Sequence, residues 1–444
     1  MHGETIYMHG ETIYALSSAP GRAGVAVVRV SGPDAARAVQ ALTGKPPPAP
    51  RNAVLARFSD VSGVAIDRGL VLYFEAPASF TGEDVAEFHL HGGRATVEAL
   101  LAALAAAGLR PAEPGEFTRR AVENGKLDLT QAEAVADLID AETEAQRRQA
   151  LRQYDGILSD LYERWRQELI RATAWAEAAI DFSDEELPAG TLTRAHAVVL
   201  EILQEIQKHL NDSRRGETLR EGLCLTVIGP PNAGKSSLVN ALARRDVAIV
   251  AETAGTTRDV VEVRLDLGGY LVTLADTAGL RPTMEAVEAE GVRRALARAQ
   301  SADLVLLLLD GSAEDPMAGL PPNTRADLTV WNKADLPWPA KCSGPAISLK
   351  TGQGLDALVT VLAAQVRDRL EAPGEAPVLT RKRHRHALEQ AARSLESALA
   401  ASPGHPELLA EDLRLALRAL GRITGRVDIE ELLDVVFRDF CIGK

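Results

Sequence analysis

An eight-residue stretch after a short apolar run constrains the fold of this chain more than any other feature. The stretch has the pattern G-x-x-x-x-G-K-S and reads Gly229-Pro230-Pro231-Asn232-Ala233-Gly234-Lys235-Ser236. The apolar residues 223–228 precede it and a helix-compatible run follows from Ser237, which is the strand, turn and helix order of a P-loop. Its backbone N–H groups can surround phosphates, Lys235 can neutralise phosphate oxygens, and the Ser236 hydroxyl can bind Mg²⁺. The sequence predicts a P-loop domain; a chance glycine-rich turn is the alternative.

Three further motifs follow the P-loop in the order expected of a GTPase. Asp276-Thr277-Ala278-Gly279 has the D-x-x-G form, in which a carboxylate reaches the Mg²⁺ shell and a glycine amide faces the γ-phosphate. In Asn332-Lys333-Ala334-Asp335, the last carboxylate can accept from N1–H and from the exocyclic amine of guanine, a donor pair that adenine does not offer. Ser348-Leu349-Lys350 fits the loop that backs the base. Between the P-loop and these three motifs, Gly255-Thr256-Thr257-Arg258-Asp259 can supply a threonine to Mg²⁺. Together these motifs predict GTP as the nucleotide.

The hydrolysis chemistry departs from the Ras-like pattern at one position. Leu280 follows D-x-x-G where a glutamine would orient the attacking water. A side-chain oxygen of Asn232 in the P-loop can hold a monovalent cation against the phosphates, in place of an arginine finger. Glu288 can orient the water through a second water, with a solvated helix face as the alternative interpretation.

Length and composition set the outer limits. The chain has 444 residues, enough for roughly two to four domains, and 49 Lys and Arg against 62 Asp and Glu give a net charge of −13. This balance argues against broad nonspecific binding of nucleic acid. The three cysteines are far apart, no apolar stretch is long enough to span a bilayer, and no secretory signal is evident. We therefore expect a cytoplasmic protein that does not enter membranes.

Pattern changes along the chain predict a multidomain architecture. Residues 1–125 read as a compact α+β domain, with 1–7 as an extension because MHGETIY is repeated in 8–14. Residues 126–215 and 373–444 read as two parts of an all-α helical domain. Residues 216–372 read as a Ras-like α/β GTPase domain inserted between them. A hairpin at Gly268-Gly269 is expected at the edge of its mostly parallel sheet.

Three shorter features leave alternatives open. His89 and His91 share one strand face, and we expect structural histidines there rather than metal ligands. Thr130-Gln131-Ala132-Glu133 matches a capping box at the start of a helix. The basic segment 381–386 can meet RNA phosphates or form a solvated helix start, and the sequence does not choose between them.

Longer stretches across nearly the whole chain resemble the MnmE (TrmE) family of tRNA-modification GTPases. The matching stretches are GRAGVAVVRVSG, FTGEDVAEFHLHGG, NGKLDLTQAEAVADLIDA, GPPNAGKSSLVNAL, AGTTRDV, DTAGLR and a terminal FCIGK. The GTPase motifs would fit many GTPases, whereas the N-terminal stretches and the terminal tail narrow the resemblance to this family.

The resemblance implies a homodimer that works with the flavoprotein MnmG on tRNA. The reaction adds a carboxymethylaminomethyl or aminomethyl group at C5 of the wobble uridine, and hydrolysis is coupled to potassium-dependent pairing of GTPase domains. A reduced folate (5-formyl- or methylene-tetrahydrofolate) is implied as carrier or ligand in the N-terminal domain. The resemblance places the folate contacts on Arg29, Glu87, Lys126 and Lys444. The carboxylates of folate suit Arg29, Lys126 and Lys444, and the donors of its pterin suit Glu87.

The remaining site residues are carried over position by position. The resemblance and the motifs together imply catalytic roles for Glu288, Asn232, Lys235 and the tail cysteine Cys441. Mg²⁺ would take Ser236 and Thr257, and K⁺ would take Asn232, Ala251, Thr253 and Thr256. The expected GTP contacts are Asn232, Ala233, Gly234, Lys235, Ser236, Ser237, Ala251, Glu252, Thr253, Ala254, Gly255, Thr256, Thr257, Asp276, Thr277, Ala278, Gly279, Asn332, Lys333, Asp335, Ser348, Leu349 and Lys350.

One departure from the family affects the cation site. The family commonly has Thr or Ser where this chain has Ala251. If this position gives only its backbone carbonyl to the cation, the change is harmless; if the hydroxyl helps, the affinity for potassium falls. The alternative function is a regulatory GTPase switch that gates a partner complex without folate chemistry. Folate binding separates the two hypotheses, because a plain switch has no use for it.

Overall fold

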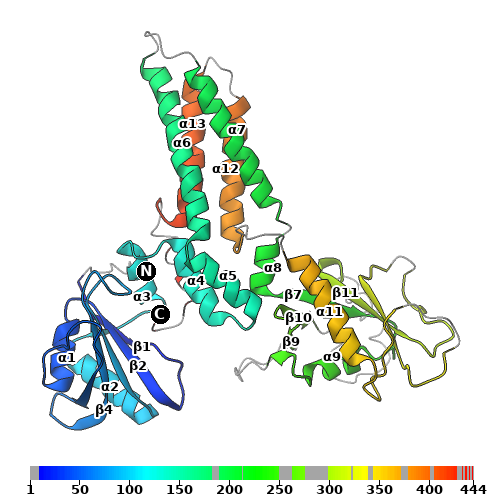
Figure 1. Ribbon diagram of the computed structural model, residues 1–444, viewed down its shortest axis with the longest axis horizontal. Helices are drawn as coiled ribbons and strands as arrows, with labels where there is room; N and C mark the ends of the chain where they lie inside the picture. The colour runs from blue at the N-terminus through cyan, green and yellow to red at the C-terminus, as the bar shows by residue number, and fades with distance from the viewer. Residues whose placement is uncertain are drawn as a thin grey trace, which may run out of the picture. The chain divides into compact units, whose positions relative to one another are not determined.

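The computed structural model of this chain describes residues 10–182, 190–212, 214–249, 263–275, 299–321, 324–338, 344–371, 379–400 and 405–427, with residues 433, 436, 437, 440 and 443. The chain divides into two compact units. Unit 1 comprises Met1–Ala136, Ser159–Arg166 and Leu417–Lys444, and unit 2 comprises Asp137–Leu158 and Gln167–Ala416. Figure 1 labels many of the helices and strands of the two units.

Unit 1 is built on a six-stranded sheet with the strand order β3-β4-β5-β2-β1-β6. Every pairing is antiparallel except that of β1 with β6. The strands are β1 (Ile13–Leu16), β2 (Ala23–Ser31), β3 (Val54–Ser59), β4 (Ala65–Phe74), β5 (Val85–Gly92) and β6 (Arg110–Pro111). The helices are α1 (Ala35–Thr43), α2 (Arg94–Ala106), α3 (Glu116–Glu123) and the first part of α4 (Leu129–Asp140).

Alternation along the strands separates an apolar face of this sheet from a polar one. Val28, Val30 and Phe88 point to one face, where α1 and α2 complete a buried core. The intervening residues Arg29 and Glu87 therefore lie on the opposite face. The α+β character predicted for this part of the chain is confirmed.

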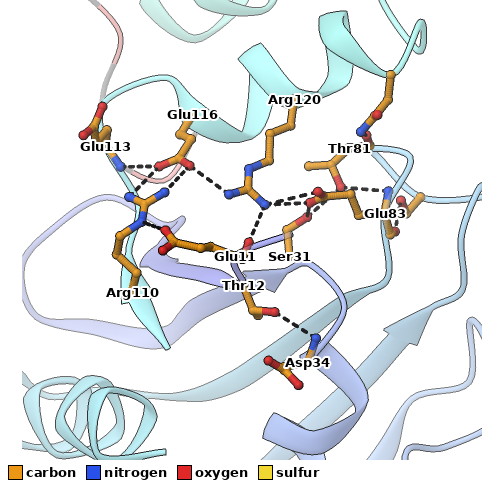
Figure 2. A network of polar contacts seen from close by, with 12 residues as sticks. Glu11, Thr12, Ser31, Asp34, Thr81, Glu83, Arg110, Glu113, Glu116 and Arg120 are labelled. Atoms are coloured by element: carbon orange, nitrogen blue, oxygen red, sulfur yellow. Dashed lines mark hydrogen bonds and ion pairs between the residues drawn. The ribbon is translucent and has the colours of Figure 1, made fainter. Parts of the chain in front are cut away.

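A network of carboxylates and guanidinium groups ties α3 to this sheet (Figure 2). Its centre is Glu116, whose side chain is only 2% exposed. This carboxylate accepts from Arg110 Nη2 at 2.6 Å, from Arg120 Nη2 at 2.9 Å and from the Glu113 N–H at 2.8 Å. Arg120 also donates to Glu83 Oε2 at 3.0 Å and to the Glu11 carbonyl at 2.9 Å. The network thus joins the start of β1, the loop before β5 and α3.

The carboxyl-terminal residues of the chain belong to unit 1. Phe437 and Phe440 pack with Leu129 and Ala132 of α4. Further along, the Ser17 hydroxyl donates to the Gly443 carbonyl at 2.9 Å. The tail is therefore held against β1 and α4.

Unit 2 contains a set of helices, some of which precede its sheet in the sequence and some of which follow it. They are the end of α4, α5 (Glu144–Tyr154), α6 (Ile157–Asp181) from Gln167, α7 (Thr191–Leu210), α8 (Arg215–Glu221), α12 (Lys382–Ala400) and α13 (Pro406–Thr424) up to Ala416. Gln207 of α7 donates to Glu396 of α12 at 3.0 Å, and Arg414 of α13 pairs with Glu177 of α6 at 2.9 Å. Helices from the two parts of the sequence therefore pack together, as expected of a split helical domain.

The sheet of unit 2 has the strand order β12-β11-β7-β10-β9-β8. Its elements are β7 (Leu223–Ile228), α9 (Lys235–Ala243), β8 (Ala248–Ile249), β9 (Val263–Asp266), β10 (Leu271–Ala275), β11 (Leu304–Asp310), β12 (Leu328–Asn332) and α11 (Leu355–Leu370). The strands β12, β11, β7 and β10 are parallel to one another, whereas β9 pairs antiparallel with both β10 and β8. The predicted hairpin at Gly268-Gly269 is confirmed, and β8 lies outside it at the edge. Apolar residues of α9 and α11 bury one face of this Ras-like α/β sheet.

Two of the shorter expectations are corrected. The residue that caps α4 is Asp128, whose carboxylate accepts from the N–H groups of Thr130 and Gln131 at 2.7 and 3.0 Å. The predicted capping box at Thr130 and Glu133 is therefore wrong by two residues, and Glu133 is buried. The basic segment 381–386 is only in part a solvated helix start, because Arg385 pairs with Asp212 and Glu217 and Arg381 pairs with Asp137. Lys382 and His386 are exposed.

Two further findings concern membranes and metals. Across the described residues, no helix combines the length and the apolar character needed to cross a bilayer. The described ranges also contain no group of three or more potential metal-ligating side chains. His91 instead bonds to Asp67 at 2.9 Å, and His89 lies 3.4 Å from Glu87.

Candidate functional site

The P-loop leaves β7 and ends at the first turn of α9, as the sequence predicts. Asn232 adopts a left-handed conformation with φ of 60°, which asparagine tolerates better than most residues. Gly234 has φ of 102°, and a Cβ at this position would lie 2.5 Å from Asn332 Nδ2. The loop is therefore packed so closely against Asn332 that only glycine fits.

The lysine and the two serines of the motif stand at the amino end of α9. Lys235 Nζ donates to the carbonyls of Gly229 at 2.9 Å and of Pro230 at 2.7 Å, so its ammonium group lies over the loop. Ser236 and Ser237 follow in the first helical turn, where backbone N–H groups and the helix dipole favour an anion. This arrangement matches a phosphate site.

Asn332 joins the two halves of the candidate nucleotide site. Its side chain is buried at the end of β12, where Nδ2 donates to the Ala233 carbonyl at 2.8 Å. Its Oδ1 accepts from the Leu349 N–H at 3.2 Å. One amide therefore connects the P-loop to the loop Ser348-Leu349-Lys350, and both loops are fixed by the same residue.

Asp335 lies at the exposed side of this site. Ser348 Oγ donates to Asp335 Oδ1 at 2.6 Å, and this hydrogen bond lowers the pKa of the Asp335 carboxyl below its ordinary value. The carboxylate is therefore ionised at neutral pH and its second oxygen can accept further donors. The nearby charge of Lys350 acts in the same direction.

Several expected residues lie outside the described ranges. They are the cation and switch residues Ala251, Glu252, Thr253, Ala254, Gly255, Thr256 and Thr257, the motif Asp276, Thr277, Ala278 and Gly279, the acid Glu288, and the tail residues Cys441 and Lys444. Their roles stay predictions. The described part of the nucleotide site is thus the P-loop with the two base loops.

A second candidate site lies in unit 1, on the sheet face opposite α1 and α2. Arg29 and Glu87 are direct cross-strand partners on β2 and β5, and Arg29 Nη2 lies 2.9 Å from Glu87 Oε1. The guanidinium also lies over the rings of Phe80 and Phe117, 5.3 and 5.7 Å from their centroids. Lys126 Nζ donates to the Pro77 carbonyl at 3.0 Å in the neighbouring loop.

Sequence reasoning missed several of these relations. It assigned Arg29 and Glu87 to different parts of a ligand, whereas the two side chains form one ion pair. Nothing in the sequence around Phe80 or Phe117 indicates that their rings pack against the guanidinium group of Arg29. Asp310 and Trp338, which both contact Lys333, lie outside the familiar motifs and gave no signal of their own.

Comparison with known proteins shows the family of this chain. The family model of the MnmE helical domain matches residues 129–441, and that of the GTP-binding protein TrmE N-terminus matches residues 12–126. The tRNA modification GTPase MnmE of Parvibaculum lavamentivorans is 59% identical over 435 residues, covering 97% of this chain and 99% of the relative. The protein of the same name from Paramagnetospirillum magneticum is 57% identical over 440 residues, with the same coverage. This chain belongs to the MnmE family of tRNA modification GTPases.

Proposed function

We propose that this chain binds and hydrolyses GTP in order to modify tRNA. With the flavoprotein MnmG it would take part in adding a carboxymethylaminomethyl or aminomethyl group at C5 of the wobble uridine. The observation that carries the nucleotide part is the double hydrogen bond of Asn332, which fixes the P-loop and the base loop as one site. The tRNA part rests on the names of the relatives.

Guanine selection would fall to Asp335. Because its pKa is lowered, it stays an acceptor at neutral pH and matches the N1–H and amine donors of guanine. Adenine would leave this carboxylate without donors, and an unpaired charge next to a bound base is costly. We therefore expect strong discrimination between GTP and ATP.

The phosphate end would hold Mg²⁺ and a monovalent cation. Hydroxyl and amide oxygens are the hard donors that such cations prefer, and Ser236 and Asn232 carry them at the P-loop. A bound Mg²⁺ supplies electrostatic stabilisation of the transferring phosphoryl group. Lys235 would neutralise the phosphate oxygens, Asn232 with Ala251, Thr253 and Thr256 would hold K⁺, Thr257 would complete the Mg²⁺ site, and Glu288 would orient the water.

The K⁺ proposal can be tested by comparing GTP hydrolysis in potassium and in sodium at equal ionic strength. We expect a large stimulation by potassium that Asn232→Ala removes. Equal rates in both salts would contradict the cation role and would leave the transition-state charge to a partner protein. Glu288→Ala should retain GTP binding and lose most hydrolysis, and normal turnover in that variant would remove the glutamate from the mechanism.

The unit 1 site is proposed to bind a reduced folate through Arg29, Glu87, Lys126 and Lys444. The Arg29–Glu87 ion pair beside the half-buried ring of Phe80 supports this, because it offers charged groups suited to the donors of a pterin and to the carboxylates of folate. Phe117 is fully buried and contributes by packing against the guanidinium group. Calorimetric titration of the full chain with 5-formyl-tetrahydrofolate should give saturable binding that Arg29→Gln weakens. An absence of binding would favour the alternative, a regulatory GTPase switch.

The remaining parts of the proposal concern the reaction and the assembly. The tail cysteine Cys441 would act in modification rather than in hydrolysis, and the protein would work in the cytoplasm as a homodimer. Cys441→Ser should therefore keep the GTPase rate and lower the modified uridine that mass spectrometry of digested tRNA detects in reactions with MnmG. Unchanged modification would restrict Cys441 to a structural role.

A further inference from the structure

Lys333 of the guanine-recognition motif is held by side chains that belong to none of the four GTPase motifs. We propose that Asp310 and Trp338 are positioning residues for purine-base binding, which act by fixing Lys333. This inference rests on the proposed function of the site as a GTP site. Together with Gly311, the two residues are called the Lys333 frame below.

The first observation is the backbone of Lys333. Its φ is 65°, a left-handed conformation that a long side chain adopts only when its surroundings impose it. The carbonyl of Lys333 accepts from Trp338 Nε1 at 3.2 Å and from the Leu336 N–H at 2.9 Å. The indole of Trp338 therefore helps to hold the turn that contains Lys333.

The second observation is the ammonium group of Lys333. Its Nζ lies 2.5 Å from Asp310 Oδ2, at the end of the neighbouring strand β11. The other oxygen of Asp310 accepts from the N–H of Ser312 at 2.9 Å and from its hydroxyl at 2.6 Å. Both carboxylate oxygens are thus engaged, which fixes the direction in which Asp310 holds the lysine.

Charge and burial agree with this geometry. Burial alone would raise the pKa of Asp310, but hydrogen bonds from Lys333 and Ser312 lower it below the ordinary value. Asp310 is therefore ionised at neutral pH and neutralises the lysine. What remains for Lys333 to offer a purine is its apolar stem, which can cover one face of a base.

The third observation joins the two side chains of the frame. A Cβ on Gly311 would lie 2.5 Å from the indole of Trp338, so the ring lies directly on this backbone. The Gly311 N–H also donates to the Asn332 carbonyl at 3.0 Å, beside the residue that connects the two nucleotide loops. The end of β11, the turn after β12 and Trp338 therefore form one continuous support beneath Lys333.

The chain offers a matched control at the other end of the same two strands. Asp327 is 20% exposed, as Asp310 is, and pairs with Arg369 at 2.6 Å and more weakly with Arg325 at 3.4 Å. Its carboxylate also accepts from a backbone N–H, that of Val305 at 2.8 Å. Asp310→Asn and Asp327→Asn therefore remove equivalent ion pairs from one sheet, and only the first touches Lys333.

The test is GDP binding to the full chain by titration calorimetry, together with KM and kcat for GTP. Asp310→Asn should raise the Kd for GDP about tenfold, the size expected for a lost charge-assisted hydrogen bond, and should raise KM with kcat unchanged. Trp338→Phe keeps the ring and loses the N–H, and should raise the Kd about threefold. Asp327→Asn should bind GDP as the unaltered chain does, although both Asp variants lower the thermal midpoint to a similar extent.

Three outcomes would overturn the inference. They are unchanged GDP affinity in both frame variants, an equal loss of affinity in Asp327→Asn, and a fall in kcat without a rise in KM. If Asp310→Asn fails to fold, Trp338→Phe decides by itself. Asp335→Asn separates this inference from the proposed GTP-binding function. If the unaltered chain binds no GDP, the GTP site itself is refuted. If Asp335→Asn loses GDP binding while both frame variants keep it, only the role of the Lys333 frame is refuted.

Discussion

Replacing Glu116 with glutamine should open the edge of the unit 1 sheet without unfolding the rest of the chain. Glutamine keeps the shape of the side chain, but it turns an amide donor toward the guanidinium groups of Arg110 and Arg120, which are themselves donors. Removing one partner of a buried ion pair typically costs about 3–5 kcal/mol. Arg120 retains Glu83 and the Glu11 carbonyl, and Arg110 retains Glu11, so we expect the lower end, about 3 kcal/mol.

Hydrogen exchange measured by mass spectrometry localises this effect. A loss of about 3 kcal/mol corresponds to roughly a hundredfold faster exchange for amides that exchange through this opening. The accelerated peptides should be those from β1 (Ile13–Leu16) and α3 (Glu116–Glu123). Arg94→Gln, which breaks the Arg94–Glu98 pair with 90% and 62% exposed side chains, is the control and should leave every peptide unchanged. Equal protection in Glu116→Gln and the unaltered chain would refute the reasoning.

The same residue predicts a dependence on pH. Burial acts to raise the pKa of Glu116, but the hydrogen bond from Arg110, the Glu113 N–H and the nearby guanidinium charges lower it overall. A carboxyl whose folded pKa lies below its unfolded value, about 4.3, stabilises the fold above that pH. This stability is lost as the pH falls through the folded pKa. Protection in β1 and α3 should therefore decline under acid in the unaltered chain and change less in Glu116→Gln.

Asp137→Asn should lower the free energy of unfolding of unit 2 by about 3 kcal/mol, because Asp137 is 11% exposed and accepts from both Arg220 and Arg381. Urea titration followed by circular dichroism measures this loss, and an unchanged midpoint would contradict the prediction. Gly443→Ala should release Gly443 from Leu16, because Gly443 has φ of 96° and an added Cβ would lie 2.1 Å from the Leu16 carbonyl oxygen. Limited proteolysis should then cleave the carboxyl terminus faster than in the unaltered chain. An unchanged cleavage rate would contradict the prediction.

The sequence predicts the position of the P-loop well, because a P-loop is formed by consecutive residues. Strand, turn and helix lie within about twenty consecutive residues, and the glycines have no other common use at that spacing. The bounds of β7 match the apolar run 223–228, whereas α9 begins at Lys235, two residues before the expected start at Ser237. The link made by Asn332 was not visible, because it joins residues that are 99 positions apart.

The error at the start of α4 has a specific physical reason. Asp128-x-x-Gln131 and Thr130-x-x-Glu133 both match the capping-box pattern, and they overlap in the sequence. Burial decides between them, because Glu133 is 1% exposed and lies within the helix. Nothing in the local sequence indicates which register is buried, so the choice requires the fold.

The basic segment 381–386 shows the same limit over a longer distance. Arg381 and Arg385 pair with carboxylates more than 160 positions away, at Asp137, Asp212 and Glu217. A sequence window reads such a segment as free positive charge suited to RNA phosphates. In the folded chain these guanidinium groups are already paired, so an RNA would have to compete with carboxylates held in place.

Asp137 and the neighbouring helix α5 hold the sheet of unit 2 through charged contacts and hydrogen bonds. Arg220 precedes β7 and Arg381 precedes α12, so in the sequence the whole six-stranded sheet of unit 2 lies between these two arginines. Both of them donate to the same oxygen, Oδ1 of Asp137. The hairpin of β9 and β10 is fastened to the same helical segment, because the Ala145 N–H donates to the Gly269 carbonyl and Arg264 pairs with Glu142 at 2.8 Å. Burial and the neighbouring charge of Asp137 raise the pKa of Asp140 beside these contacts. A movement of the sheet against α5 would therefore break charged contacts at Asp137 and at the hairpin together.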